Sequence, residues 1–138
     1  MKEYYHKVQY YETDMMQIVH HSNYIRWFEE ARLAMLDEAR YPYSRMEAEG
    51  CYIPVLSVSA EYKKACKFGE TVRISAKVVK YTNVKFFVEY EVWDEKGTEL
   101  RATGTSSHCF VDSSFNPIIP RKVNKALDEI FKSFVTVS

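Results

Sequence analysis

Apolar and polar residues alternate along several stretches of this chain, as they do in half-buried β-strands. Residues 4–12 alternate loosely, and their aromatic and β-branched content favours a strand. Four further strands are expected at about 53–63, 70–81, 84–94 and 98–111. In the middle two of these, apolar residues occupy every other position: Val72, Ile74, Ala76 and Val78, then Phe86, Val88, Tyr90 and Val92.

One long segment follows a helical period instead. From Ser22 to about Arg40 there is no Gly or Pro, and apolar residues recur at spacings of three and four: Tyr24, Ile25, Trp27, Phe28, Ala31, Ala34 and Met35. Ser22 or Asn23 is the expected N-cap. A helix of this length spans ~28 Å and needs a broad surface to lie against, which a curved sheet supplies.

Turn-forming residues separate these elements. Residues 43–50 are expected to form a turn or short helix, and residues 81–83 and 94–97 to form hairpin turns. A terminal helix at about 121–132 is expected to direct Val123, Leu127 and Ile130 into the core. No repeat or linker divides the chain, so residues 1–138 are predicted to be a single α+β domain. In this domain one antiparallel sheet of about five strands wraps the long helix.

Composition narrows the possible functions. The 19 basic and 19 acidic side chains cancel, so no global field favours nucleic acid or a membrane surface. No apolar run approaches the ~20 residues of a membrane span, and the first residues lack a signal peptide. The 3 cysteines are widely spaced, which favours free thiols over disulfides or a zinc site. We expect a cytoplasmic protein.

The candidate chemistry lies where the first extended segment meets the long helix. Asp14 precedes that helix by about eight residues. The arrangement can hold one carboxylate beside unpaired helix N–H groups, which suits attack on a carbonyl such as an acyl thioester. Taken alone, Asp14 also fits a turn or capping residue. His20 and His21 do not favour a metal site, because adjacent side chains point apart and no His-Glu-x-x-His motif follows.

The same region resembles the hotdog-fold thioesterases, in the branch of 4-hydroxybenzoyl-CoA thioesterase and the Tol–Pal-associated acyl-CoA thioesterases. The resemblance rests mainly on two blocks, Tyr10-x-Glu12-Thr13-Asp14-x-x-x-Ile18-Val19-His20-His21-Ser22-Asn23-Tyr24 and Arg26-Trp27-Phe28-Glu29-x-Ala31-Arg32. Weaker blocks follow in the same order: Ile53-Pro54-Val55, Glu61-Tyr62, Phe68-Gly69-Glu70 and His108-Cys109-Phe110-Val111-Asp112. The resemblance covers nearly the whole chain.

The resemblance implies a hotdog fold and hydrolysis of an acyl-CoA to free acid and CoA without a cofactor or metal. Asp14 is then the catalytic nucleophile or general base, and the backbone N–H near His21 polarises the thioester carbonyl. Family members are homodimers, often paired into homotetramers, with active sites between subunits. Either CoA or acyl-carrier protein is a possible acyl donor.

The predicted substrate-binding residues are Gln17, Tyr24, Glu29 and Lys85. Many relatives have Gly where this chain has Gln17, so its side chain is expected to restrict the acyl entrance. Glu29 matches a helical acid that faces the substrate ring in hydroxybenzoyl-CoA members, although Arg32 at i+3 offers it an ion pair instead. Lys63, Lys64, Lys67 and Lys85 are candidates for the CoA phosphates, of which Lys85 is preferred, although surface lysines commonly have no ligand.

Two other functions fit this chain. A hotdog hydratase or dehydratase needs a His–Glu pair on a Gly/Pro-rich motif, and no such motif surrounds the histidines. A non-catalytic acyl-CoA or acyl-carrier binding module is the second alternative, and an intact Asp14 argues against it.

Overall fold

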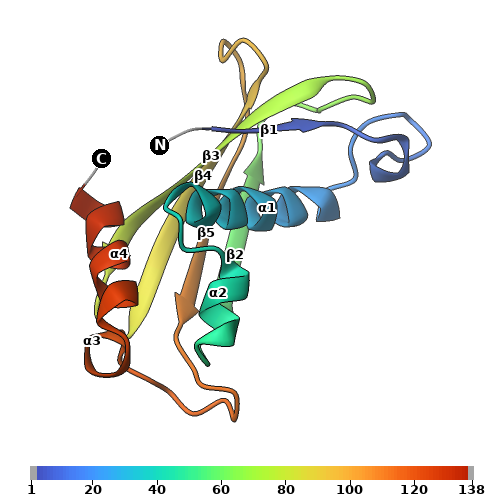
Figure 1. Ribbon diagram of the computed structural model, residues 1–138. Helices are drawn as coiled ribbons and strands as arrows, with labels where there is room; N and C mark the ends of the chain where they lie inside the picture. The colour runs from blue at the N-terminus through green and yellow to red at the C-terminus, as the bar shows by residue number, and fades with distance from the viewer. Residues whose placement is uncertain (1–2, 137–138) are drawn as a thin grey trace.

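A computed structural model describes residues 3–136 of the chain. The elements follow in the order β1 (Tyr4–Lys7), a 3₁₀ helix (Tyr10–Glu12), α1 (Ser22–Glu38), α2 (Tyr43–Ala48), β2 (Val55–Tyr62), β3 (Thr71–Tyr81), β4 (Lys85–Asp94), β5 (Leu100–Cys109), α3 (Pro120–Val123) and α4 (Lys125–Thr136). Helix α1 crosses one face of a curved sheet, and α4 lies at one side of that face (Figure 1). This arrangement confirms the predicted α+β class and the hotdog fold.

The sheet is antiparallel throughout, with the strand order β1-β3-β4-β5-β2. Strands β1 and β2 are therefore its two edges. The predicted period of two is confirmed in β3 and β4, where Val72, Ile74 and Val78 and then Phe86, Val88, Tyr90 and Val92 are buried. The buried positions of neighbouring strands are in register, so together they form one continuous apolar face beneath α1.

Phe28 of α1 packs tightly against the sheet. Its ring stacks on Tyr90 with centroids 4.4 Å apart. A side chain on Gly104 would place its Cβ 2.3 Å from Phe28 Cε2 and 2.8 Å from the carbonyl oxygen of Ser59. Only glycine therefore allows the helix to lie this close to β5.

The C-terminal helix covers the other part of the core. Leu127, Phe131 and Phe134 of α4 are buried, and Phe131 contacts the ring of Phe86 with centroids 4.6 Å apart. The predicted terminal helix was thus placed too early, because Asn124 separates α3 from α4 and its Oδ1 accepts a hydrogen bond from the Leu127 N–H. Val123, expected in the core, lies in α3 and is 63% exposed.

The N-terminal segment also differs from expectation. The strand predicted for residues 4–12 ends at Lys7, and the chain then turns through a 3₁₀ helix that buries the Glu12 side chain. The N-cap of α1 is His21 in helical conformation, so neither Ser22 nor Asn23 caps the helix. Asn23 instead donates from Nδ2 to the carbonyl of Glu12. Within residues 3–136 no helix is both long and apolar enough to cross a bilayer.

Candidate active site

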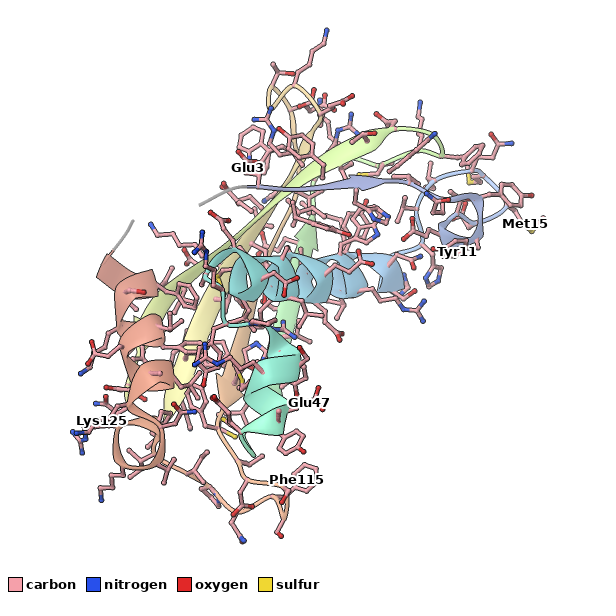
Figure 2. All side chains as sticks on the ribbon, in the orientation of Figure 1. Glu3, Tyr11, Met15, Glu47, Phe115 and Lys125 are labelled. Atoms are coloured by element: carbon pink, nitrogen blue, oxygen red, sulfur yellow. The ribbon has the colours of Figure 1, made fainter. Side chains whose placement is uncertain are left out.

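Asp14 lies on a tight hairpin that immediately precedes α1. Thr13 and Val19 form an antiparallel bridge, and the Asp14 N–H donates to the carbonyl of Ile18 at 2.9 Å. The tip is closed by Gln17, whose N–H donates to the carbonyl of Asp14 at 2.9 Å. Gln17 has φ +65°, a left-handed conformation that favours glycine. The hairpin lies beyond the first turn of α1, where Figure 2 shows Met15 at the far end of the molecule.

Within the described part of the chain, the start of α1 presents a backbone donor without an acceptor, the His21 N–H. The Ser22 N–H donates to Nδ1 of His20, and the Asn23 N–H donates to the His20 carbonyl. The Tyr24 N–H donates to the His21 carbonyl. The N–H of His21 has no acceptor among residues 3–136. Because the peptide dipoles of α1 concentrate partial positive charge at this end, a carbonyl oxygen that becomes negative is stabilised there.

A cavity of about 220 Å³ lies beside this helix start. Its walls include Ile18, His21, Tyr24, Tyr62, Lys63 and Lys64. The rings of Tyr24 and Tyr62 meet edge to face with centroids 4.9 Å apart, and the Tyr62 hydroxyl donates to the His21 carbonyl at 3.4 Å. The lining therefore combines aromatic rings with basic side chains.

Tyr24 lines the cavity but is not a reactive group. Its side chain is 3% exposed, and burial, followed by its contact with the Cys66 thiol, raises the pKa of its hydroxyl. Burial likewise raises the pKa of the Cys66 thiol, so neither group ionises near neutral pH. The three cysteines are free thiols, as expected.

The basic side chains of the lining come from the loop between β2 and β3. Arg101 of β5 holds this loop by donating to the Ala65 carbonyl at 3.0 Å and to both carboxylate oxygens of Glu70 at 3.2 and 3.0 Å. Lys63 and Lys64 of the same loop pair with Glu61 at 3.2 Å and with Glu99 at 2.9 Å. An incoming phosphate would therefore compete with carboxylates that already contact these ammonium groups.

The Asp14 side chain itself is exposed in the single chain. Its Oδ1 accepts a hydrogen bond from the Met16 N–H at 2.8 Å, and Asp14 is not among the residues that line the cavity. This contact is the turn geometry expected of a structural aspartate. The hairpin nevertheless brings Asp14 to the same end of α1 as the free His21 N–H, because Ile18 bonds Asp14 and also lines the cavity.

Comparison with known proteins decides the family. The model of the thioesterase-like superfamily matches residues 8–127. The chain belongs to the thioesterase-like superfamily.

Relatives of this thioesterase-like chain agree with the assignment. YneP of Bacillus subtilis, named as a candidate acyl-CoA thioesterase, is 39% identical over 117 residues, covering 84% of each chain. A candidate esterase of Aquifex aeolicus is 34% identical over 123 residues, covering 89% of this chain and 94% of the relative. The crystal structure of the DHNA-CoA thioesterase from Staphylococcus aureus superposes with a TM-score of 0.90 at 31% identity, covering 96% of this chain and 89% of that one. The prediction of a thioester hydrolase is confirmed, and the narrower hydroxybenzoyl-CoA or Tol–Pal branch stays a prediction.

The fold of this thioesterase brings some of the predicted site residues together and separates others. Asp14, Gln17, His21 and Tyr24 lie at one end of α1. Lys85 of β4 lies opposite Cys109 of β5 in the sheet, whereas Tyr62, which lines the cavity, lies opposite Ala102 of β5. Seven residues of β5 span ~23 Å, and this distance separates Lys85 from the cavity.

The ion pair with Arg32 that was the alternative role for Glu29 does not form, and the expectation that the His20 and His21 side chains point apart is wrong. Arg32 does not pair with Glu29, because its guanidinium turns into the core and donates to the Tyr90 hydroxyl at 3.0 Å, which leaves Glu29 exposed. The rings of His20 and His21 do not point apart, since their centroids are 4.2 Å apart where the chain turns into α1.

Tyr62 is a residue of the site that the sequence does not identify as a candidate. Nothing local to the Glu61-Tyr62 block indicates a place beside His21, 41 residues earlier.

Proposed function

We propose that this chain is an acyl-CoA thioesterase in which Asp14 and the start of α1 act on the thioester. The observation that supports this most directly is the His21 N–H, which has no acceptor within residues 3–136 and belongs to a residue lining the cavity. A donor held in this way needs no reorganisation when a thioester oxygen becomes an oxyanion. The names of the Bacillus and Staphylococcus relatives support a CoA thioester as the substrate.

Two routes are compatible with one carboxylate at this place. Asp14 attacks the carbonyl carbon directly, the C–S bond breaks, and water then hydrolyses the resulting mixed anhydride. Alternatively Asp14 removes a proton from water as that water attacks the same carbon, and the CoA thiolate leaves and is protonated. In both routes the His21 N–H donates to the carbonyl oxygen while it carries negative charge.

Substrate handling follows from the aromatic and basic side chains that line the cavity. The aromatic rings of Tyr24 and Tyr62 offer an apolar contact beside the reacting carbonyl, and Gln17 on the hairpin restricts the acyl entrance. Lys63 and Lys64 supply positive charge for the phosphates of CoA. Glu29 and Lys85 are substrate contacts only if a second subunit brings them to the cavity.

We also propose that a second copy completes the site and encloses Asp14. Strand β2 is an edge of the sheet with an uncovered apolar surface: Val55 is 53%, Leu56 49%, Val58 43% and Tyr62 49% exposed. Exposed edge strands are normally covered in folded proteins, and pairing of β2 with the β2 strand of a second subunit would cover this edge. Tyr62 links that edge directly to the cavity.

The deciding experiment measures release of free thiol from short, long and aromatic acyl-CoAs by wild type, Asp14→Asn and Asp112→Asn. Asp112 is a matched control because its Oδ1 also accepts a hydrogen bond from the N–H two residues later, at 2.9 Å, in another exposed loop. We expect Asp14→Asn to fold and to lose at least ~100-fold in kcat, with Asp112→Asn unchanged.

Equal activity of wild type and Asp14→Asn would remove Asp14 from the mechanism. Binding of acyl-CoA without thiol release by the wild type would favour the non-catalytic binding module. Hydration of an enoyl-CoA without thiol release would favour the hydratase. Acyl-carrier protein thioesters assayed beside the CoA panel distinguish the two donors.

A further inference from the structure

A carboxylate is buried two residues before Asp14. Glu12 is 4% exposed although its neighbours Tyr10 and Tyr11 are 70% and 78% exposed. Burying an ionised carboxylate is unfavourable unless hydrogen-bond donors replace the lost water. A charge kept buried between exposed neighbours therefore has a structural or functional reason.

The structure supplies those donors from three different elements. Oε1 of Glu12 accepts from Nε2 of His6 in β1 and from the N–H of Gln9, both at 2.8 Å. Oε2 accepts from Nε1 of Trp27 in α1 at 2.7 Å. Burial alone would raise the pKa of Glu12, but these donors lower it below its ordinary value, so the group is ionised at neutral pH.

The main chain of Glu12 makes a second set of contacts. Its carbonyl accepts from the His20 N–H and from Nδ2 of Asn23, both at 2.9 Å. The chain therefore enters the Asp14 hairpin at Glu12 and returns to the same residue at His20, directly before α1. Side chain and main chain together join β1, the hairpin and the first turn of α1 at one residue.

The far strand and tip of the hairpin contact the loop between β2 and β3, since the Val19 N–H donates to the Cys66 carbonyl at 2.9 Å and the Phe68 N–H donates to the Gln17 carbonyl at 3.3 Å. These contacts hold the return side of the hairpin, whereas Glu12 holds the side on which the chain enters it. The Asp14 carboxylate bonds only the Met16 N–H of the same hairpin among residues 3–136. Of these contacts, those made by Glu12 join the hairpin to β1 and α1, so the position of Asp14 relative to α1 depends in part on Glu12.

We propose that Glu12 is a positioning residue for thioester hydrolysis, whose ionised side chain holds the Asp14 hairpin against the start of α1. This inference rests on the proposed function, because it gives Glu12 a role only through Asp14. Both carboxylate oxygens of Glu12 accept hydrogen bonds. The side-chain amide of Gln has the same shape but replaces one of these oxygens with an NH₂ group, which then faces an N–H donor without an acceptor between them. Glu12→Gln therefore displaces the hairpin while the packing of Trp27 is kept.

The first test compares Glu12→Gln with Asp128→Asn. Asp128 is a matched control because it is also buried, at 3% exposure, and accepts from the Tyr81 hydroxyl at 2.6 Å, but it lies on α4. We expect both variants to lower the melting temperature by similar amounts. Only Glu12→Gln is expected to lower kcat, by ~10–100-fold with KM within about threefold of wild type, since small misplacement of a catalytic group acts on the chemical step.

The second test is the double variant Glu12→Gln/Asp14→Asn. If Glu12 acts through Asp14, the double variant is no slower than Asp14→Asn alone. A further loss equal to that of Glu12→Gln alone overturns the proposal, as does a kcat of Glu12→Gln equal to that of wild type. A wild-type rate for Asp14→Asn overturns the proposed function, whereas a slow Asp14→Asn with a fast Glu12→Gln overturns only the role of Glu12.

If Glu12→Gln does not fold, Trp27→Phe replaces it in both tests. That change removes the donor to Oε2 and keeps an aromatic ring in the core. We expect a smaller fall in kcat in the same direction, again absent in the Asp14→Asn background. An unchanged kcat for Trp27→Phe overturns the proposal.

Discussion

The hydroxyl of Tyr62, at the end of β2, lies 3.4 Å from the carbonyl oxygen of His21, at the start of α1. At this separation the hydrogen bond is weak, so the ring and not the hydroxyl is the main contribution of Tyr62 to the cavity. Tyr62 thereby connects the exposed edge of the sheet with the predicted oxyanion donor.

Removal of the Tyr62 ring is expected to weaken substrate binding. Tyr62→Ala should raise KM for acyl-CoA at least about fivefold, because an aromatic contact of ~1 kcal/mol is lost. Tyr62→Phe keeps the ring and should stay within about twofold of wild type. Steady-state thiol release measures both, and an Ala variant with the KM of wild type would show that the substrate does not contact this wall.

A charge on the inner face of the β2 edge is expected to prevent assembly. Val58→Lys should shift the protein from dimer or tetramer to monomer and abolish turnover, because the β2 edge can no longer be covered by an apolar partner. Val84→Lys is the control. Val84 and Val58 are each 43% exposed, but Val84 lies in the turn between β3 and β4, away from the β2 edge. Light scattering coupled to gel filtration reports the mass, and a monomeric, active wild type would contradict the prediction.

Two substitutions at Gln17 separate its backbone from its side chain. Gln17→Gly should raise the unfolding free energy by ~1 kcal/mol over Gln17→Ala, because only glycine relieves the strain at φ +65°. Both variants remove the side chain, so both should widen the range of acyl lengths hydrolysed. Urea unfolding and the acyl-CoA panel provide the two measurements. An unchanged chain-length profile in both variants would end the idea that Gln17 restricts the entrance.

Gly104 is expected to tolerate no side chain. Gly104→Ala should lower the unfolding free energy by ~3 kcal/mol, because its Cβ would overlap Phe28 and the Ser59 carbonyl. Thr103→Ala, at the adjacent position on the opposite face of β5, should have a smaller effect. Urea unfolding followed by circular dichroism tests this, and equal losses in the two variants would refute the steric explanation.

The buried His108 predicts loss of stability in mild acid. Burial, followed by the nearby Arg32 cation, lowers the pKa of His108 from 6.5 to about 4 in the folded protein. As the pH falls through this interval the unfolded chain binds a proton that the folded chain does not. The unfolding free energy should therefore be highest above pH 6.5 and decline by up to ~3 kcal/mol toward pH 4.

His108→Gln removes this titration and keeps a polar group beside Ser106, whose hydroxyl lies 2.8 Å from His108 Nε2. Chemical denaturation at a series of pH values should show a flatter profile for the variant between pH 6.5 and 4. Parallel profiles would assign the acid sensitivity to other groups.

The periodic parts of this protein were predictable from local sequence. Helix α1 and strands β3 and β4 lie close to their predicted bounds, because their apolar residues repeat at the period of the element that buries them. The segment before α1 was predicted less well. The strand in this segment is shorter than expected because the Glu12 side chain turns inward to donors on β1 and α1. No local sequence pattern indicates that this charge is buried.

The candidate site divides in the same way. Asp14 and His21 are candidates from the sequence and its family resemblance, because the motif and the helix start are contiguous. The aromatic wall at Tyr62, the unpartnered His21 N–H, the support from Glu12 and the distance of Lys85 from the cavity depend on contacts between distant segments. Those contacts are set by strand order and register, which arise only when the whole apolar face of the sheet closes over α1.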